Sequence, residues 1–310
     1  MRIAFFSGGA GPVPLQALRA VAREHEIAVV VRPALHPNDG RRPLRALLRP
    51  VARRLGLAKP DPVADIARAH RAPLVTAHGR GDSGLAPRIE RARADAICIA
   101  GYPWLLPRSV LALARLGAVN LHPSLLPRHR GLLPLFWIYW HDDRETGVTA
   151  HLATGRADAG PVLVAERFPL ARGLPVDRLN EENGRRGGGV LVEALAQLER
   201  GARGTPQETA LATRAPLVEP GRSMIRFDEW DVERVWHFCA GLAGRFEEPL
   251  TDHGARPVRY DTVTRYERAR HGRAPGGVER RKDGLRLYCL GGHVSLAWSA
   301  DDALGRAKRA

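Results

Sequence analysis

The feature that most constrains the fold is a series of short, uninterrupted apolar runs separated by helical patterns. Residues 27–31 read Ile-Ala-Val-Val-Val, and residues 96–100 read Ala-Ile-Cys-Ile-Ala. Strands that are buried on both faces of a parallel sheet have this continuous apolar character. A strand-like run at 2–6, a Gly-rich turn at 7–11 and an amphipathic helix over 12–24 precede the first run. This order is a βαβ unit, so we expect an α/β domain with a mostly parallel sheet.

The size and composition of the chain are those of a globular protein with more than one domain. It has 310 residues, of which 44% are hydrophobic and 26% charged. No apolar run approaches the roughly 18 residues of a membrane span, and the N-terminus lacks a secretory pattern, so we expect a cytoplasmic protein. Cys98, Cys239 and Cys289 show no paired spacing and the histidines show no repeated ligand spacing, so neither a disulfide framework nor a metal site is predicted.

The formal net charge of +15 comes mostly from arginine. Such a composition can arise in a GC-rich genome, and it is also typical of proteins that bind polyanions. The segment 41–59 concentrates these side chains, with leucines at helical spacing between arginines. It is either an amphipathic surface helix with a solvated face or a basic insertion that grips RNA or an anionic substrate. Charge by itself therefore does not identify the substrate.

A polar cluster follows the hydrophobic residues that precede position 120. If residues 118–122 are extended, Asn120 and His122 share one face while Leu121 points into the core. Asp158 comes later, in a Gly-bearing turn between two strand-like runs. Taken singly, an Asn near a turn, a His and an Asp in a Gly-rich turn all have ordinary structural roles.

Together, these three groups have the chemistry needed to move a formyl group onto an amine. Attack of an amine on a formyl carbon develops an oxyanion, which a neutral amide donor such as Asn120 stabilises. The attacking nitrogen must lose a proton, which suits the imidazole of His122. A neighbouring carboxylate such as Asp158 orients that ring and favours its charged form.

A longer sequence pattern surrounds these three residues. It reads Asn120-Leu-His122-Pro-Ser124-Leu-Leu-Pro127-Arg-His-Arg130-Gly131, followed by Glu145-Thr-Gly-Val-Thr149 and Asp158-Ala-Gly160. This pattern resembles the folate-dependent formyltransferase family, whose signature is Asn-x-His-x-Ser-x-Leu-Pro-x-x-(Arg)-Gly with a later Asp. The resemblance implies a Rossmann-like formyltransferase core, with Asn120, His122 and Asp158 as catalytic residues and 10-formyltetrahydrofolate as the formyl donor.

Further positions are predicted to bind substrates. The loop 101–107 follows the apolar run 96–100, at the carboxyl end of a strand where open α/β sheets bind ligands. It resembles the family loop whose backbone holds the pterin ring, so the predicted folate-binding residues are Tyr102, Trp104, Leu105 and Leu106. The residues predicted to contact the substrate are Ser124, Arg130 and Arg156. Arg156 either attracts a phosphate or carboxylate or simply faces water.

The second half of the chain changes character. We expect a catalytic domain over 1–200, a linker rich in Gly, Pro and Thr over 201–222, and a β-rich domain over 223–310. The last of these has short strand-like runs and Gly-bearing turns. Their order resembles the C-terminal OB-like domain of the methionyl-tRNA enzymes of the family, and such a domain either binds RNA or only supports the core.

The sequence leaves more than one alternative for the amine that accepts the formyl group. Residues 132–137, Leu-Leu-Pro-Leu-Phe-Trp, resemble enzymes that act on small amines or amino sugars, and the Asp-Arg-Pro-Ala-Gly-Arg-Gly loop of the methionyl-tRNA enzymes is absent. The C-terminal domain and the charge favour initiator methionyl-tRNA instead. Because Thr154 and Arg156 depart from the family motif, a non-catalytic RNA-binding or carrier protein is a third alternative, of another class. We favour the small amine.

Overall fold

The computed structural model describes residues 1–34 and 60–298, which form two compact units. Of the described residues, 1–34, 60–132, 147–167 and 180–214 form the first unit, and 133–146, 168–179 and 215–298 form the second. The basic segment 41–59, predicted as a helix, lies outside the described residues. Among the helices that the structure describes, none has both the length and the apolar character needed to cross a membrane.

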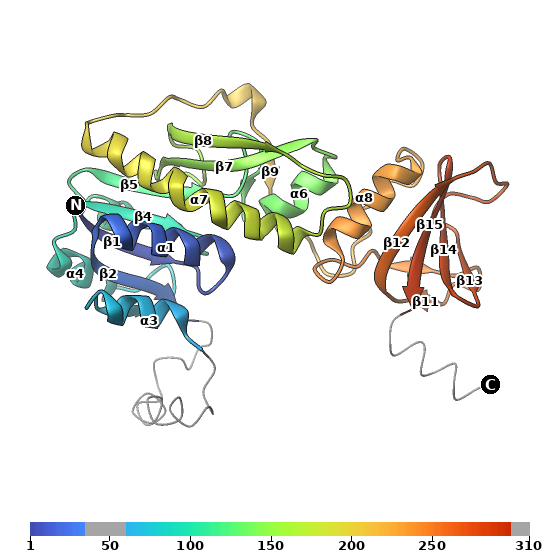
Figure 1. The fold of residues 1–310 in the computed structure, drawn as a ribbon, viewed down its shortest axis with the longest axis horizontal. Coiled ribbons are helices and arrows are strands. Elements are labelled where there is room, and N and C mark those ends of the chain that lie inside the picture. The colour runs from blue at the N-terminus through green and yellow to red at the C-terminus, as the bar shows by residue number, and fades with distance from the viewer. Residues whose placement is uncertain (35–59, 299–310) are drawn as a thin grey trace. The chain divides into compact units, whose positions relative to one another are not determined.

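The first unit is built on a seven-stranded sheet with the order β3-β2-β1-β4-β5-β7-β8 (Figure 1). Strands β1 to β5 are parallel to one another, and β7 runs antiparallel to β5. The strands are β1 (Arg2–Ser7), β2 (Glu26–Pro33), β3 (Leu74–Ala77), β4 (Ala96–Ala100), β5 (Gly117–His122), β7 (Glu145–Leu152) and β8 (Val162–Pro169). The predicted α/β fold with a mostly parallel sheet is confirmed.

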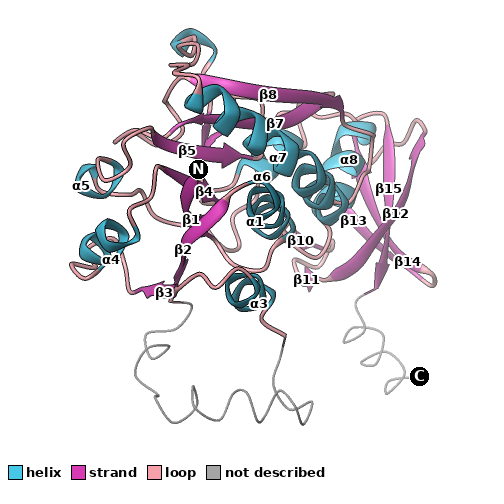
Figure 2. Ribbon diagram, turned by 60° about the vertical axis from the view of Figure 1, so that its left-hand side comes forward, coloured by secondary structure: helices cyan, strands magenta, loops and turns pink. Residues whose placement is uncertain are grey.

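Helices cover both faces of this sheet. The side chains of Ile3 and Phe5 pack in one cluster with α1 (Pro12–Glu24), α3 (Pro62–Ala69) and α7 (Val176–Glu199). Those of Ala4 and Phe6 pack in another cluster, with α4 (Leu85–Ala92) and α5 (Arg108–Leu111). Figure 2 shows α4 and α5 on one side of the sheet and α1 and α7 on the other. Because neither face meets water, β4 and the middle of β1 and of β2 are apolar at every position, which explains the uninterrupted runs in the sequence.

Helix α7 is continuous over 24 residues, although glycines at positions 184 and 187–189 weaken its helical pattern. A Cβ on Gly184 would lie 2.7 Å from the Pro12 carbonyl oxygen, and a Cβ on Gly187 would lie 2.8 Å from Leu121 Cδ2. These glycines allow α7 to pack closely against the start of α1 and against β5. The backbone of the strand that carries Asn120 and His122 is thus supported directly by α7.

The second unit contains a four-stranded antiparallel sheet with the order β12-β15-β14-β13. Its strands are β12 (Tyr260–Arg268), β13 (Val278–Arg281), β14 (Gly284–Cys289) and β15 (Gly292–Trp298), beside a short pair, β10 (Leu250–Thr251) and β11 (Pro257–Val258). Helices α6 (Pro134–Trp140) and α8 (Val232–Leu242) contribute Phe136 and Phe238 to its core. The expected β-rich C-terminal part is therefore present as a small antiparallel β unit.

Candidate active site

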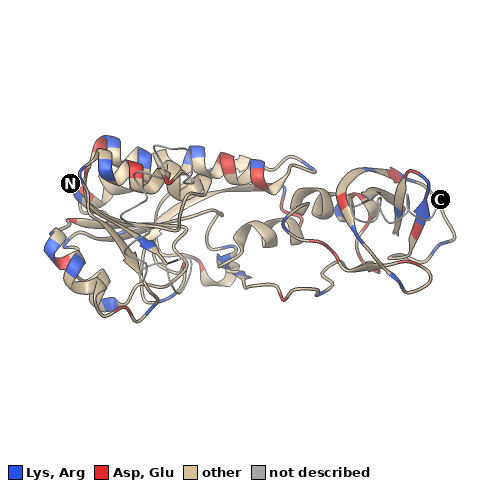
Figure 3. Cartoon of the chain, turned by 90° about the horizontal axis from the view of Figure 1, so that it is seen from below, with Lys and Arg blue, Asp and Glu red and all other residues tan. Residues whose placement is uncertain are grey.

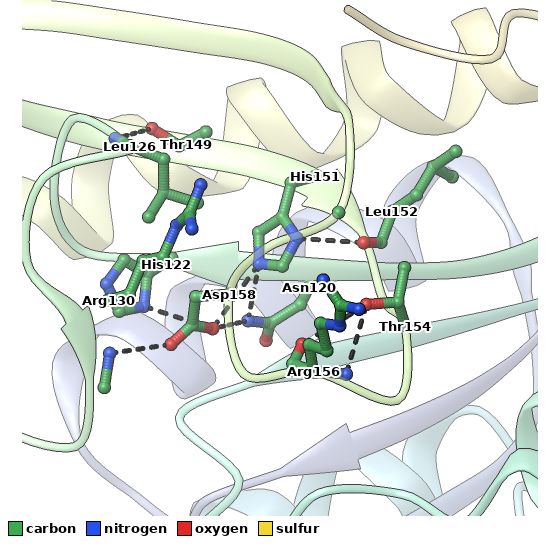
Figure 4. Close-up of polar contacts among 12 residues, drawn as sticks. Asn120, His122, Leu126, Arg130, Thr149, His151, Leu152, Thr154, Arg156 and Asp158 are labelled. Carbon is green, nitrogen blue, oxygen red and sulfur yellow. Dashed lines mark hydrogen bonds and ion pairs between the residues drawn. The ribbon is translucent and has the colours of Figure 1, made fainter. Parts of the chain in front are cut away.

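The pairing of β5 with β7 places a second histidine beside Asn120. In the antiparallel register Asn120 lies opposite His151, and His122 lies opposite Thr149. Directly opposite residues project from the same face of a sheet, and Asn120 Nδ2 lies 3.0 Å from His151 Nε2 (Figure 4). Leu121, between the two predicted catalytic residues, is buried in the core, as the alternation along the strand predicted.

Asp158 accepts hydrogen bonds at both of its carboxylate oxygens. Its Oδ1 accepts from Asn120 Nδ2 at 3.0 Å, and its Oδ2 accepts from the Gly131 N–H at 2.9 Å. Its φ of 49° lies in the left-handed region, which Asp adopts more readily than most residues. The turn is tight at Gly160, where a Cβ would lie 1.8 Å from the Leu152 carbonyl oxygen. Asp158 is therefore held with its carboxylate against the end of β5.

Two acceptors determine the orientation of the Asn120 amide. His151 Nδ1 lies 2.9 Å from the Leu152 carbonyl oxygen, which can only accept, so Nδ1 carries the ring proton and Nε2 of the neutral ring is an acceptor. The Asp158 carboxylate is also an acceptor. Asn120 must therefore direct its NH₂ group at both, and both of its N–H bonds are used.

His122 is buried and faces Asp158 through Nδ1. Its Nε2 lies 2.9 Å from the His129 carbonyl oxygen, so Nε2 carries a proton and donates it. Its Nδ1 lies 3.6 Å from Asp158 Oδ1. Burial lowers the pKa of His122, and the facing Asp158 carboxylate offsets this only in part. At neutral pH the ring is neutral, with a lone pair on the nitrogen that faces the carboxylate.

The Asp158 carboxylate stays ionised at neutral pH. Burial by itself raises its pKa, but the interactions with His122 and His151 in their protonated forms and with the Gly131 N–H outweigh burial and bring the pKa to about 2. A proton taken up at His122 Nδ1 therefore lies next to a negative charge. The arrangement can take a proton from a nucleophile and stabilise the imidazolium that results.

The residues predicted to bind folate lie in the loop after β4. The Tyr102 ring packs edge-on against Phe6 and Trp104, at centroid distances of 5.3 and 5.6 Å. The Tyr102 hydroxyl is buried without a hydrogen-bond partner among the described residues, and burial raises its pKa to about 12. Leu106 belongs to the core, whereas Leu105 is 40% exposed. The loop thus combines an unpartnered hydroxyl with an exposed apolar side chain, and its role in folate binding stays a prediction.

The three residues predicted to contact the substrate differ in their surroundings. Ser124 is fully buried, and its hydroxyl donates to the Arg128 carbonyl at 2.8 Å, which closes the loop after β5. Arg156 is exposed, and its backbone N–H donates to Thr154 Oγ1 at 3.3 Å. Arg130 is half-buried and directly precedes Gly131, which binds Asp158. Substrate contact by each of the three stays a prediction.

Two residues of the site, His151 and Gln207, were not singled out from the sequence. The register of β5 against β7 places His151 opposite Asn120, and this register could have been inferred only by assuming the antiparallel pairing. Gln207 lies in the segment expected to be a linker, and its side-chain amide donates to the carbonyls of Asp158 and Gly160 at 3.0 and 2.6 Å. No local pattern marks Gln207, because both partners lie more than 45 residues earlier in the chain.

Comparisons with known proteins identify the family. Residues 1–195 match the family model described as formyl transferase. The chain belongs to the formyl transferase family. It is 34% identical over 240 residues to the methionyl-tRNA formyltransferase of Nitrosospira multiformis, and the aligned residues cover 76% of this chain and 72% of that protein. It is 32% identical over 250 residues to the methionyl-tRNA formyltransferase of Syntrophus aciditrophicus, with 80% and 79% covered.

A solved structure of a sugar formyltransferase has a similar fold over nearly the whole chain. WlaRD, a sugar 3N-formyl transferase studied in the presence of dTDP and 5-N-formyl-THF, superposes with a TM-score of 0.66 at 12% identity, covering 97% of this chain and 98% of that one. Family membership makes this formyltransferase a one-carbon transferase, as the sequence pattern predicted. Among the described residues, no group of three or more His, Cys, Asp or Glu side chains is arranged to hold a metal ion.

Proposed function

We propose that this formyltransferase transfers the formyl group of 10-formyltetrahydrofolate to the primary amine of a small molecule, with amino sugars as the favoured class. The observation that carries the proposal is the meeting of Asn120, His122 and Asp158 at the carboxyl end of β5, where Asn120 lies within hydrogen-bond distance and His122 within ion-pair distance of Asp158. This group of residues offers an amide donor, a neutral imidazole and an ionised carboxylate, which are the parts that formyl transfer to an amine requires.

In this proposal His122 is the base. The amine gains positive charge as it attacks the formyl carbon, so its proton must leave for the amide product to form. The bond between the formyl carbon and the folate nitrogen breaks in the same transfer, and that nitrogen takes up a proton, so that tetrahydrofolate leaves. His122 receives this proton at Nδ1, because Nε2 is committed to the His129 carbonyl. Burial favours the neutral ring that is needed to accept the proton, and the ionised Asp158 stabilises the ring once it is charged.

Asn120 stabilises the negative charge that develops on the formyl oxygen. Its two N–H bonds already donate to His151 Nε2 and Asp158 Oδ1, so the oxyanion must replace or share one of these acceptors. Hydrogen bonds to ionised groups are roughly twice as strong as those between neutral groups. We therefore expect the N–H that faces the His151 ring to turn toward the oxyanion, while the N–H that donates to the Asp158 carboxylate stays in place.

The loop after β4 is the proposed folate site. When bound there, the co-substrate supplies an activated formyl group. The unpartnered hydroxyl of Tyr102 and the exposed Leu105 fit a flat ring system with polar edges. The shared fold with WlaRD, which was studied in the presence of a formyl-folate, supports this placement.

The charge distribution favours a small acceptor over a tRNA. Residues 215–298 carry 14 Lys and Arg against 12 Asp and Glu, so this part of the chain is nearly neutral. Several of its arginines are paired, such as Arg268 with Glu233 and Arg280 with Asp252. Figure 3 shows basic and acidic residues interspersed over the C-terminal sheet. A surface that binds RNA needs a continuous positive field instead.

Methionyl-tRNA is the second candidate acceptor. The relatives from Nitrosospira multiformis and Syntrophus aciditrophicus, both above 30% identity, are methionyl-tRNA formyltransferases. The segment 35–59 also carries seven Lys and Arg against one Asp, which would attract a polyanion.

The test is a competition between acceptor classes. The full chain is given 10-formyltetrahydrofolate with initiator methionyl-tRNA, nucleotide-linked amino sugars or small amines, and formylated product is measured by mass. We expect kcat/KM to be highest for a small amine and to depend weakly on salt. A kcat/KM that is highest for the tRNA and falls steeply with salt would overturn the choice of acceptor but leave formyl transfer intact.

A further inference from the structure

Residues 202–214, which we name the strap, run along the active site of the first unit. At one end the strap exchanges two backbone hydrogen bonds with β8, between Thr205 and Val162 at 2.7 and 2.8 Å. At the other end Thr213 accepts from the backbone N–H groups of His129 and Arg130, at 2.8 and 2.9 Å. The strap therefore touches both segments that hold Asp158 in place, the turn before β8 and the loop after β5.

Gln207, in the middle of the strap, connects these two segments through one side chain. Its amide nitrogen donates to the backbone carbonyls of Asp158 and Gly160, at 3.0 and 2.6 Å. Its amide oxygen accepts from Nε and from a terminal nitrogen of Arg130, at 3.0 and 2.7 Å. Both polar atoms of the Gln207 amide are thus satisfied, and only an amide of this length supplies two N–H donors and an acceptor here.

Arg130 keeps its full charge in this arrangement. Among the described residues its partner is the neutral Gln207, and no carboxylate lies within ion-pair distance of its guanidinium. A glutamate at position 207 would have neutralised Arg130 and repelled the carbonyls of Asp158 and Gly160. The glutamine instead orients the guanidinium without cancelling its charge, which leaves a cation beside the reacting groups for an anionic group of the acceptor.

We propose that Gln207 is a positioning residue that sets the Asp158 turn and the Arg130 guanidinium relative to each other. This inference rests on the proposed function, since it assigns the two ends of the contact to two parts of the same reaction. Through Asp158, Gln207 acts on the proton transfer at His122. Through Arg130, it acts on the binding of an acceptor that carries a phosphate or carboxylate.

The test compares Gln207→Ala and Gln207→Glu with a matched control, Gln197→Ala. Gln197 is also half-buried, on α7, and within the described part of the chain its amide donates to the exposed Glu193 alone, at 3.3 Å. We expect Gln207→Ala to lower kcat by about 10- to 100-fold and to raise the KM of an anionic acceptor, because small displacements of reacting groups are costly. Gln207→Glu should raise that KM at least as much, because the new carboxylate competes for Arg130. Gln197→Ala should change neither.

A second readout separates this inference from the proposed function. The imidazole signals of His122, assigned with a His122→Asn variant, are followed against pH by NMR in the chain without substrates. We expect Gln207→Ala to shift the apparent pKa of His122, because the Asp158 carboxylate is displaced, and Gln197→Ala to leave it unchanged. An unchanged titration together with wild-type kcat and KM would overturn the inference. Absence of turnover in the wild type, with the shift present, would count against the proposed function only.

Discussion

The close packing of α7 leads to a prediction in which two similar substitutions have opposite effects. Gly184 and Gly189 lie in the same helix, where alanine is favoured over glycine by about 1 kcal/mol. A Cβ on Gly189 would meet no atom within 4 Å, so Gly189→Ala should stabilise the protein by up to about 1 kcal/mol. A Cβ on Gly184 would lie 2.7 and 2.8 Å from the carbonyl oxygen and carbon of Pro12, which are backbone atoms and cannot rotate away.

The magnitude follows from the difference between the two variants. The helix-propensity gain is common to both and cancels, so the difference is the cost of inserting one methyl group into a filled space. Overpacking of this kind typically costs about 1–3 kcal/mol. We therefore expect Gly184→Ala to be less stable than Gly189→Ala by about 1–3 kcal/mol. Because Gly184 packs on the start of α1, and not on β5, the activity of folded Gly184→Ala should be close to that of the wild type.

The assay is urea denaturation of the full chain, followed by the fluorescence of its tryptophans and by circular dichroism. The variants are compared through the midpoint of the transition that reports the α/β unit, since two units need not unfold together. Equal midpoints for Gly184→Ala and Gly189→Ala would refute the argument that glycine is required for close approach. A loss of stability in both variants would refute it as well, because Gly189 has free space around it.

Four predictions concern the site itself. Asp158→Asn should lower kcat by about 10²- to 10⁴-fold while the fold is retained, as measured by steady-state turnover and circular dichroism. His122 must be neutral to accept the proton, and burial lowers its pKa from 6.5. We therefore expect kcat to be constant near pH 7 and to fall only below pH 6.5. A fall in kcat with a midpoint above pH 6.5 would contradict this. The pKa of Asp158 is lowered from 3.8 to about 2. The ionised carboxylate therefore contributes about 2 kcal/mol to the free energy of unfolding above pH 3.8, and this contribution is lost as the pH falls toward 2. Asp158→Asn should flatten the profile of stability against pH in this range. His151→Phe keeps a ring but removes the acceptor for Asn120, so kcat should fall about 10-fold with little change in KM, whereas the exposed His253→Phe should be silent in the same assay.

Much of the α/β unit could be predicted because its elements are specified locally. The apolar runs at β2 and β4 and the amphipathic pattern of α1 need no knowledge of the rest of the chain, and the structure contains each of them. The glycines of α7 could not be explained locally, because Gly184 lies against Pro12, about 170 residues away in sequence, and Gly187 lies against Leu121. Helix propensity describes an isolated helix, in which glycine is unfavourable. Gly184 and Gly187 instead allow α7 to pack closely against α1 and β5.

The site was predictable only where its residues form a continuous pattern. Asn120 and His122 are two residues apart on β5, and Asp158 belongs to the later Asp-Ala-Gly part of the same sequence pattern. His151 depends on a register between two strands, and Gln207 depends on the path of a segment without regular periodicity. Hydrogen bonds of this kind connect residues that are distant in sequence, so they become visible only after the strands have been paired.

The most direct test of the central claim is to follow the formyl group itself. The wild type and Asp158→Asn are incubated with 10-formyltetrahydrofolate that carries ¹³C in the formyl group, together with the panel of primary amines. The appearance of a labelled N-formyl amide is then measured by NMR. We expect labelled amide with the wild type and at least about 100-fold less with Asp158→Asn. Label that stays on folate for every amine and for methionyl-tRNA would contradict formyl transfer, and label that moves equally fast with both proteins would contradict the role of Asp158.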